Sequence, residues 1–150
     1  LMAFVDARKK EGNKIKKVLI KKINSLEVAV LKISKVNKVS QKKRLKVFKL
    51  KIANLIKDLD ETRVNQEIAL LALKHDVSEE LDRIIFHTKS MNQELKKQSC
   101  SGKKIDFILQ ELFREANTLS VKLDDPNSKN LALDAKLLVE EMREQIQNVE

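Results

Sequence analysis

Residues 15–33 have the sequence IKKVLIKKINSLEVAVLKI, and the fold class of this 150-residue chain follows from the pattern within that stretch. Its apolar side chains recur at intervals of three and four residues, at Ile15, Leu19, Ile23, Leu26, Val30 and Ile33. This spacing places them on one face of an α-helix and leaves the other faces mostly to Lys. The stretch therefore predicts one long amphipathic helix, from about Ala3 to Val36.

A second segment repeats the same period farther along the chain. Its apolar positions are Leu45, Phe48, Ile52, Leu55, Ile56, Leu59, Val64 and Ile68. We expect this segment to be helical to about Leu73. Two long amphipathic helices in succession predict an antiparallel hairpin, a Lys-rich arm made of residues 1–75.

Three further helices are predicted between residues 76 and 150. Asp76, followed three residues later by Glu79, predicts a capping box that starts a helix ending near residue 97. The next helix follows the loop at 98–102 and has an apolar stripe at Ile105, Ile108, Leu109, Leu112, Ala116 and Leu119. Pro126 marks a turn before the last helix, whose apolar positions are Leu131, Leu138, Met142, Ile146 and Val149.

The composition supports an all-α protein of about five helices. One Pro, two Gly and 3% aromatic residues leave few helix breakers and little material for a sheet. We therefore expect an arm over residues 1–75 and a small helical bundle over residues 76–150. Because the helical pattern starts almost at once after Leu1, we also expect the chain to be a fragment of a larger protein.

The cellular setting is predicted from two simple features. Cys100 has no second cysteine to pair with, which is typical of a protein from the reducing cytoplasm. The sequence has no run of about 18 apolar residues, so we expect no membrane-spanning segment.

Positive charge is concentrated at the front of the chain. Residues 1–57 contain 18 Lys and Arg against 3 acidic residues, whereas residues 58–150 have a net charge of −6. Among the basic residues, Lys42, Lys43 and Arg44 are candidates for contact with the phosphate backbone of RNA. The alternative is a solvated helix face rich in Lys, and the charge alone does not decide between the two.

The third predicted helix carries acidic, basic and titratable groups on one face, at Asp76, Glu80, Arg83 and His87. Glu79 lies one turn before Arg83. A His that titrates near neutral pH beside carboxylates is suited to proton transfer in RNA cleavage. The alternative is a helix cap with ion pairs along a solvated face.

The fourth predicted helix presents four polar groups in similar directions, at Asp106, Gln110, Arg114 and Asn117. Glu111 and Glu115 lie farther round the helix, nearer the apolar stripe, where a packed neighbour would partly bury them. This set suits binding of a phosphodiester, with carboxylates as ligands for Mg²⁺ or Mn²⁺. The alternative is a set of contacts that hold helices or subunits together.

Residues 102–118, GKKIDFILQELFREANT, closely resemble the signature GRRLDFLxQExNREANT of the YicC-like family. Residues 66–87 resemble the family's QExxxLxxKxDxxEELxRLxxH, and residues 142–150 resemble its closing REQxQNxE. Arg8, Glu11 and Gly12 match an RxxEG element, and Lys136 keeps the family's spacing from Lys122. The resemblance covers the whole chain and is strongest from residue 66 onward.

This resemblance implies a bacterial, cytoplasmic, metal-dependent endoribonuclease that forms ring-like homohexamers enclosing RNA. It makes one set of residues candidates for catalysis, namely His87, Glu79, Glu80, Asp106, Glu111 and Glu115, with Asp106, Glu111 and Glu115 as ligands for Mn²⁺ or Mg²⁺. It adds further candidates for RNA contact, namely Arg83, Gln110, Arg114, Asn117 and Lys122, to Lys42, Lys43 and Arg44, which the concentration of positive charge already suggests. The rival hypothesis is an RNA-binding adaptor or structural oligomerisation module without catalysis.

The chain departs from the family pattern in two ways. Phe113 stands where the pattern has Asn, and Ser120-Val121-Lys122 replaces its Gly-Ser-Lys, which reduces the hydrogen-bonding capacity there. The family's N-terminal domain, of similar length, is not part of this sequence.

Overall fold

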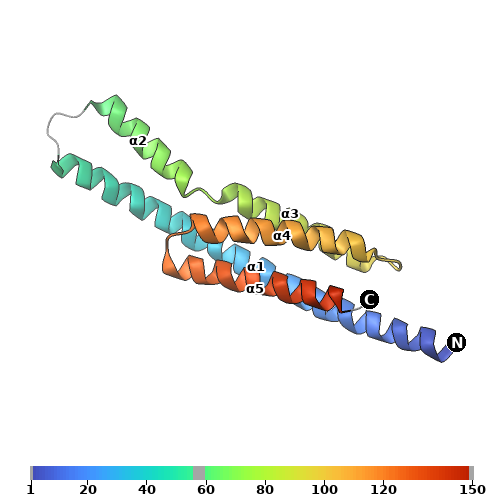
Figure 1. The fold of residues 1–150 in the computed structure, drawn as a ribbon. Coiled ribbons are helices and arrows are strands. Elements are labelled where there is room, and N and C mark those ends of the chain that lie inside the picture. The colour runs from blue at the N-terminus through green and yellow to red at the C-terminus, as the bar shows by residue number, and fades with distance from the viewer. Residues whose placement is uncertain (1, 56–59, 149–150) are drawn as a thin grey trace.

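The computed structural model describes residues 2–55 and 60–148. Over these residues the chain forms five α-helices and no strand, which confirms the predicted all-α class (Figure 1). The helices are α1 (Met2–Leu55), α2 (Glu61–Lys74), α3 (Ser78–Lys96), α4 (Gly102–Lys122) and α5 (Pro126–Gln147). Within the described ranges, none of these helices combines the length and apolar character needed to cross a bilayer.

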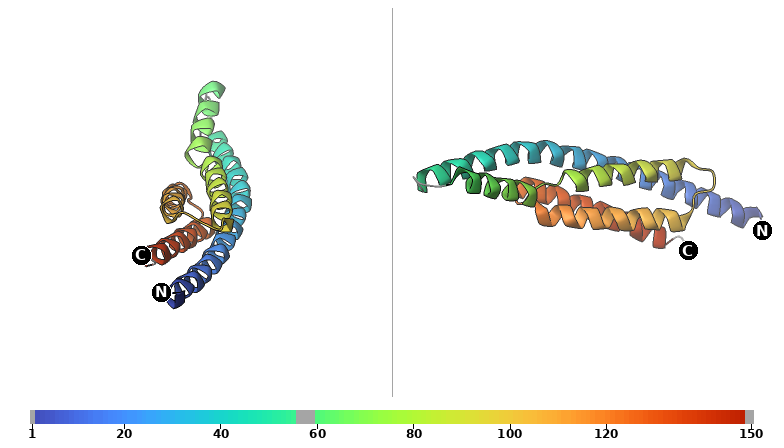
Figure 2. Two further views of the ribbon diagram at one scale, coloured as in Figure 1. Left: turned by 90° about the vertical axis from the view of Figure 1, so that its right-hand side faces the viewer. Right: turned by 90° about the horizontal axis from the view of Figure 1, so that it is seen from above.

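Four of the helices make one bundle. The first part of α1 packs against α3 and α5, and α4 packs against the other sides of the same two helices. Thus α1 and α4 lie diagonally opposite in the bundle, as the two further views show (Figure 2). Beyond the bundle, α2 runs antiparallel to the later part of α1 and packs against it (Figure 1).

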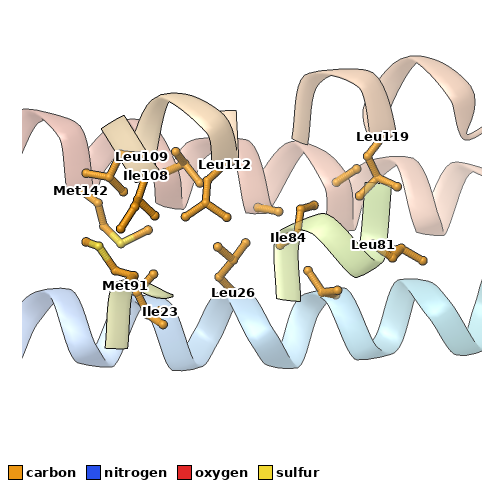
Figure 3. Close-up of a cluster of buried hydrophobic side chains, with 14 of the residues drawn as sticks. Ile23, Leu26, Leu81, Ile84, Met91, Ile108, Leu109, Leu112, Leu119 and Met142 are labelled. Carbon is orange, nitrogen blue, oxygen red and sulfur yellow. The ribbon is translucent and has the colours of Figure 1, made fainter. Parts of the chain in front are cut away.

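The core lies where apolar faces of α1, α3, α4 and α5 meet (Figure 3). The first helix supplies Leu19, Ile23, Leu26, Val30 and Ile33, all at most 1% exposed. These are the periodic positions from which the long helix was predicted. Full burial of each Leu or Ile contributes roughly 1.5–3 kcal/mol, so this row joins α1 firmly to the bundle.

The predicted boundary between the first two helices is wrong. The first helix does not end near Val36 but continues to Leu55, and the second helix begins at Glu61. The physical reason is that residues 37–54 contain no Gly or Pro that would end the helix. Side chains that are at least partly buried also recur there at helical spacing, at Asn37, Gln41, Leu45, Phe48 and Ile52. The predicted apolar positions Ile56, Leu59 and Val149, and the chain start at Leu1, lie outside the described residues.

One helix, α1, therefore takes part both in the four-helix bundle and in the packing with α2 beyond it. Residues 19–33 share a single core with α3, α4 and α5, whereas the later part of α1 packs against α2. The division of the chain into domains at residue 75 stays a prediction. What the packing shows is that the 76–150 segment buries its apolar faces partly against α1.

Acidic side chains bind backbone N–H groups at the starts of α3 and α5, although the N-cap residue of α3 is Val77, whose side chain forms no capping hydrogen bond. Asp76 Oδ1 accepts hydrogen bonds from Ser78 N at 2.9 Å and Ser78 Oγ at 2.7 Å, and these bonds lower the pKa of Asp76. Glu79 does not complete the predicted capping box, because its carboxylate binds Arg83 one turn later. At the start of α5, Asp125 accepts from Ser128 N at 2.9 Å, with Pro126 in the first turn.

Candidate functional site

Arg83 of α3 and Glu115 of α4 form an ion pair across the contact between these helices. By helical spacing Glu79, His87 and Glu111 lie near it, and we name these five residues the α3–α4 seam. Arg83 Nη1 donates to Glu115 Oε1 at 3.2 Å, and Arg83 Nη2 donates to Glu79. The Glu115 side chain is only 6% exposed, so the hydrogen bond from Arg83 offsets the cost of burying its charge. The same bond raises the pKa of Arg83.

The register of the two helices places His87 opposite Glu111. The two helices run antiparallel, and the ion pair between Arg83 and Glu115 fixes their alignment. Four residues farther along α3 is His87, and four residues back along α4 is Glu111. His87 is half-buried, and Glu111 pairs with Arg114 at 3.0 Å. An imidazole and a carboxylate therefore occupy matching positions on the seam.

Two other predicted residues form a pair at the start of α3. Lys122 Nζ lies 2.6 Å from Glu80 Oε1 and also donates to the Asp76 carbonyl oxygen at 3.4 Å. The Glu80 side chain is 7% exposed, and its Oε2 has no hydrogen-bond partner among the described residues. The ion pair between Lys122 and Glu80 thus links the end of α4 to the start of α3.

Three predicted residues lie on the other side of α4, at Asp106, Gln110 and Asn117. By helical geometry, Glu111 and Glu115 are turned about 140° and 180° away from Asp106. Gln110 Nε2 donates to Asp106 Oδ2 at 3.1 Å. The structure therefore divides the predicted site residues between two sides of α4 instead of gathering them in one place.

Two cationic side chains of α5 face this side of α4. Arg143 Nε lies 3.9 Å from Asp106 Oδ1, and Arg143 Cζ lies 6.0 Å from the centre of the Phe113 ring. Lys136 Nζ lies 5.2 Å from the same ring centre. We name these four residues, with Gln110 and Asn117, the α4–α5 patch. Sequence reasoning did not select Lys136 or Arg143 as site residues, although their spacing of seven places them on one face of α5.

The predicted metal ligands do not converge within one chain. Asp106 lies in the α4–α5 patch, whereas Glu111 and Glu115 lie in the α3–α4 seam, where Arg114 and Arg83 neighbour them. Within the ranges the structure describes, no three His, Cys, Asp or Glu side chains form a group that could hold a metal ion. As placed in a single copy, these residues do not fit a metal centre, and the metal requirement stays a prediction.

The predicted RNA contacts of α1 lie beyond the bundle core. Lys42 and Lys43 are exposed to solvent, and Arg44 Nη2 lies 2.6 Å from Asp124 Oδ1. The Arg44 side chain is 22% exposed, so this cation links α1 to the loop before α5. Their contact with RNA stays a prediction.

A groove of about 1120 Å³ opens at the end of the bundle. The first turns of α1, the loop before α4 and the last turns of α5 line it. Its floor is apolar, with Ile15, Leu19 and Ile105, and Asp106 lies at its edge. Asp106 therefore borders both this groove and the α4–α5 patch, so ligands bound in either would come near it.

Comparison with known proteins gives consistent matches. Residues 32–150 match the family described as "Endoribonuclease YicC-like, C-terminal". The "Probable endoribonuclease YicC" of Haemophilus influenzae is 39% identical over 151 residues, and that of Clostridioides difficile is 33% identical over 153 residues. Each match covers 100% of this chain and 52% of the relative, so the chain spans about half the length of these curated relatives. The chain therefore belongs to the YicC-like endoribonuclease family and matches the C-terminal part of its members.

Proposed function

We propose that this chain is the part of a YicC-like endoribonuclease that binds RNA and helps to cut it. The observation that carries the proposal is the family match over residues 32–150. That range contains every predicted site residue of the α3–α4 seam and the α4–α5 patch. Because the chain spans half of its relatives, the activity of a whole protein is part of the proposal.

In this proposal the α3–α4 seam performs proton transfer. An imidazole carries one nitrogen that can donate a proton and one that can accept it, so His87 is the proton-transfer candidate. Glu111, at the matching position of α4, would orient the imidazole or receive the proton. Arg114 is exposed beside Glu111, where its guanidinium can contact a phosphate oxygen of the substrate. Arg83 and Glu115 support this arrangement by fixing the register of the two helices.

Four further predicted residues are assigned to binding. Gln110 and Asn117 are exposed on α4 and would hydrogen-bond RNA, while Lys42 and Lys43 of α1 would attract its backbone. A dependence on Mn²⁺ or Mg²⁺, assembly as a homohexamer and a cytoplasmic location belong to the proposal because the family resemblance implies them. None of the residue roles above depends on the ion.

The proposal is tested by incubating a labelled structured RNA with a full-length homologous protein and with this chain. Each is assayed with Mn²⁺, with Mg²⁺ and with EDTA, and the products are separated on a denaturing gel. The variants are His87→Ala and Glu111→Gln. The matched controls are His75→Ala, which removes a histidine whose ring forms a hydrogen bond with the Lys122 carbonyl oxygen, and Glu144→Gln on the exposed face of α5.

We expect internal cuts by the wild-type proteins that EDTA abolishes. We expect each seam variant to lose about 10²-fold or more in rate while the controls keep their activity. Intact RNA in every lane together with a shifted band on a native gel would instead indicate the adaptor function. Cutting that survives both seam variants would show that the seam is not the catalytic site.

A further inference from the structure

The α4–α5 patch contains an arrangement that the proposed cutting reaction does not use. Lys136 and Arg143 project from the same face of α5, two turns apart, toward α4. Both cationic groups lie near the ring of Phe113, at 5.2 Å and 6.0 Å from its centre. Because Phe113 also packs against the core, the ring has a fixed position beneath the two charges.

An aromatic ring and a carboxylate bind a cation in different ways. The π-electron face attracts the charge but accepts none of the strong hydrogen bonds that a carboxylate would accept. Among the described residues, Lys136 has no hydrogen bond or ion pair, and the approach of Arg143 to Asp106 at 3.9 Å is too long for a hydrogen bond. The N–H groups of Lys136 and the outer N–H groups of Arg143 are therefore available to an external anion.

Charged groups of both signs lie near the two cations. Asp106 lies beside Arg143, and Glu140 lies one turn after Lys136 on α5. The site therefore depends on the N–H groups of Lys136 and Arg143 to which these carboxylates are not hydrogen-bonded. Two such cations can contact one phosphate group, or neighbouring groups of a phosphate backbone, at the same time.

Polar groups that suit a nucleotide border the two cations. Gln110 and Asn117 lie three residues before and four residues after Phe113, so they flank the ring on the same face of α4. Both are exposed, and an amide can donate and accept hydrogen bonds. Such groups can contact the 2′-hydroxyl of a ribose or the edge of an unpaired base.

From these observations we infer that Lys136 and Arg143, held over the Phe113 ring, form a binding site for the phosphodiester groups of RNA. This inference deepens the proposed function and rests on it. It assigns Lys136 and Arg143 as RNA-contacting residues, and it gives Phe113 the role of a positioning residue that acts through them. The family pattern has Asn at this position, so the ring is a feature of this chain.

The test measures binding separately from cutting. A fluorescently labelled, single-stranded 2′-O-methyl oligoribonucleotide, which lacks the free 2′-hydroxyl, is titrated with the intact chain at several KCl concentrations and its anisotropy is recorded. Lys136→Ala and Arg143→Ala should each weaken binding and reduce the slope of log K against log salt by about 0.7, the value per lost phosphate contact for single strands. Lys89→Ala, which removes one exposed charge from α3, should leave the slope unchanged.

Three further variants separate the possible causes of weaker RNA binding. Phe113→Leu keeps an apolar side chain against the core but removes the π face, and it should weaken binding about two- to five-fold with little change of slope. Arg143→Lys should retain most of the slope, and circular dichroism checks that every variant stays helical. The double variant Lys42→Ala/Lys43→Ala tests the alternative binding face on α1.

The outcomes are distinguishable. If Lys136→Ala and Arg143→Ala bind with the wild-type slope while Lys42→Ala/Lys43→Ala loses it, the inference is overturned and the proposed function stands. If the wild-type chain binds no RNA at any salt concentration, the inference is overturned together with the RNA-binding part of the proposed function.

Discussion

Asp106 Oδ1 and Arg143 Nε lie 3.9 Å apart across the contact between α4 and α5, and within the described part of the chain neither atom has a hydrogen bond. Both atoms are buried, although the two side chains are about one third exposed overall. The distance exceeds a hydrogen bond, so the attraction between them is mainly Coulombic. It joins the predicted catalytic carboxylate of α4 to a cation near the end of the chain.

This attraction predicts a measurable but small coupling. Because solvent screens both side chains, we expect a coupling free energy of about 0.5–1 kcal/mol between Asp106→Ala and Arg143→Ala. Urea unfolding of the two single variants and the double variant gives this quantity. If the effects of the single variants simply add, the two residues do not stabilise one another in solution.

The packing of α1 predicts opposite responses from two leucines of that helix. Leu26 is fully buried in the bundle core, whereas Leu31 is 55% exposed. Leu26→Ala should therefore lower the free energy of unfolding by about 2–5 kcal/mol, because it removes buried methyl groups and leaves a cavity. Leu31→Ala makes the same chemical change on the outer face and should stay within about 0.5 kcal/mol. Equal effects in thermal or urea unfolding would contradict the placement of α1 in the bundle.

The pair of Lys122 and Glu80 predicts an asymmetry between its two partners. Lys122→Met leaves the buried Glu80 carboxylate without its cation, whereas Glu80→Gln leaves an uncharged amide that can still accept from Lys122. An unpaired buried charge costs more than an imperfect neutral hydrogen bond. We therefore expect Lys122→Met to be the more destabilising change, by roughly 1–3 kcal/mol, in urea unfolding near neutral pH. The reverse order would show that Glu80 is solvated in solution.

Glu94 predicts a dependence of stability on pH. Its pKa is lowered from 4.5 to about 2, first by the hydrogen bond from Lys97 at 2.7 Å and then by the one from Ser101 N at 3.1 Å. Because the folded state has the lower pKa, the carboxylate's contribution is fully present above about pH 4.5 and is lost as the pH falls toward about 2.

Glu94→Gln isolates this contribution from that of the other carboxylates. We expect the wild-type chain to be more stable than the variant near neutral pH, and we expect the difference to shrink as the pH falls from 4.5 toward 2. Urea midpoints of both proteins across that pH range measure it, and Glu144→Gln serves as an exposed control. A difference that does not change with pH would contradict the assigned pKa.

Much of the fold could be predicted because helical periodicity is a local property. The spacing of Leu19, Ile23 and Leu26 predicted which side of α1 is buried, and the structure confirms it. The end of the same helix could not be predicted, because the apolar positions from Leu45 onward fit a continuation of α1 as well as the start of a second helix. Whether this stretch forms one helix or two depends on where the chain reverses direction. Between Gly12 and Gly102 the sequence has no glycine or proline that would mark that point.

The candidate site could be predicted in part. The short motifs selected the residues and, through the resemblance, the family, which the comparisons confirm. Helical geometry also predicted that Glu115 would lie near the apolar stripe, where it is indeed buried. Helical geometry gave no information on which residues of other helices these side chains would contact. Lys136 and Arg143 were therefore not predicted as site residues, and the ion pair of Lys122 with Glu80 was not predicted.

The sequence alone predicts the all-α class, the family and the buried faces of α1, α3, α4 and α5, because each depends on residues close together in the chain. The packing of the helices sets which residues face one another. Arg83 pairs with Glu115, the helix register puts His87 opposite Glu111, and Asp106 faces α5. The physical reason is that the period of a helix fixes which side chains share a face. Which helix covers that face is set by the packing of the whole bundle, through contacts between residues far apart in sequence.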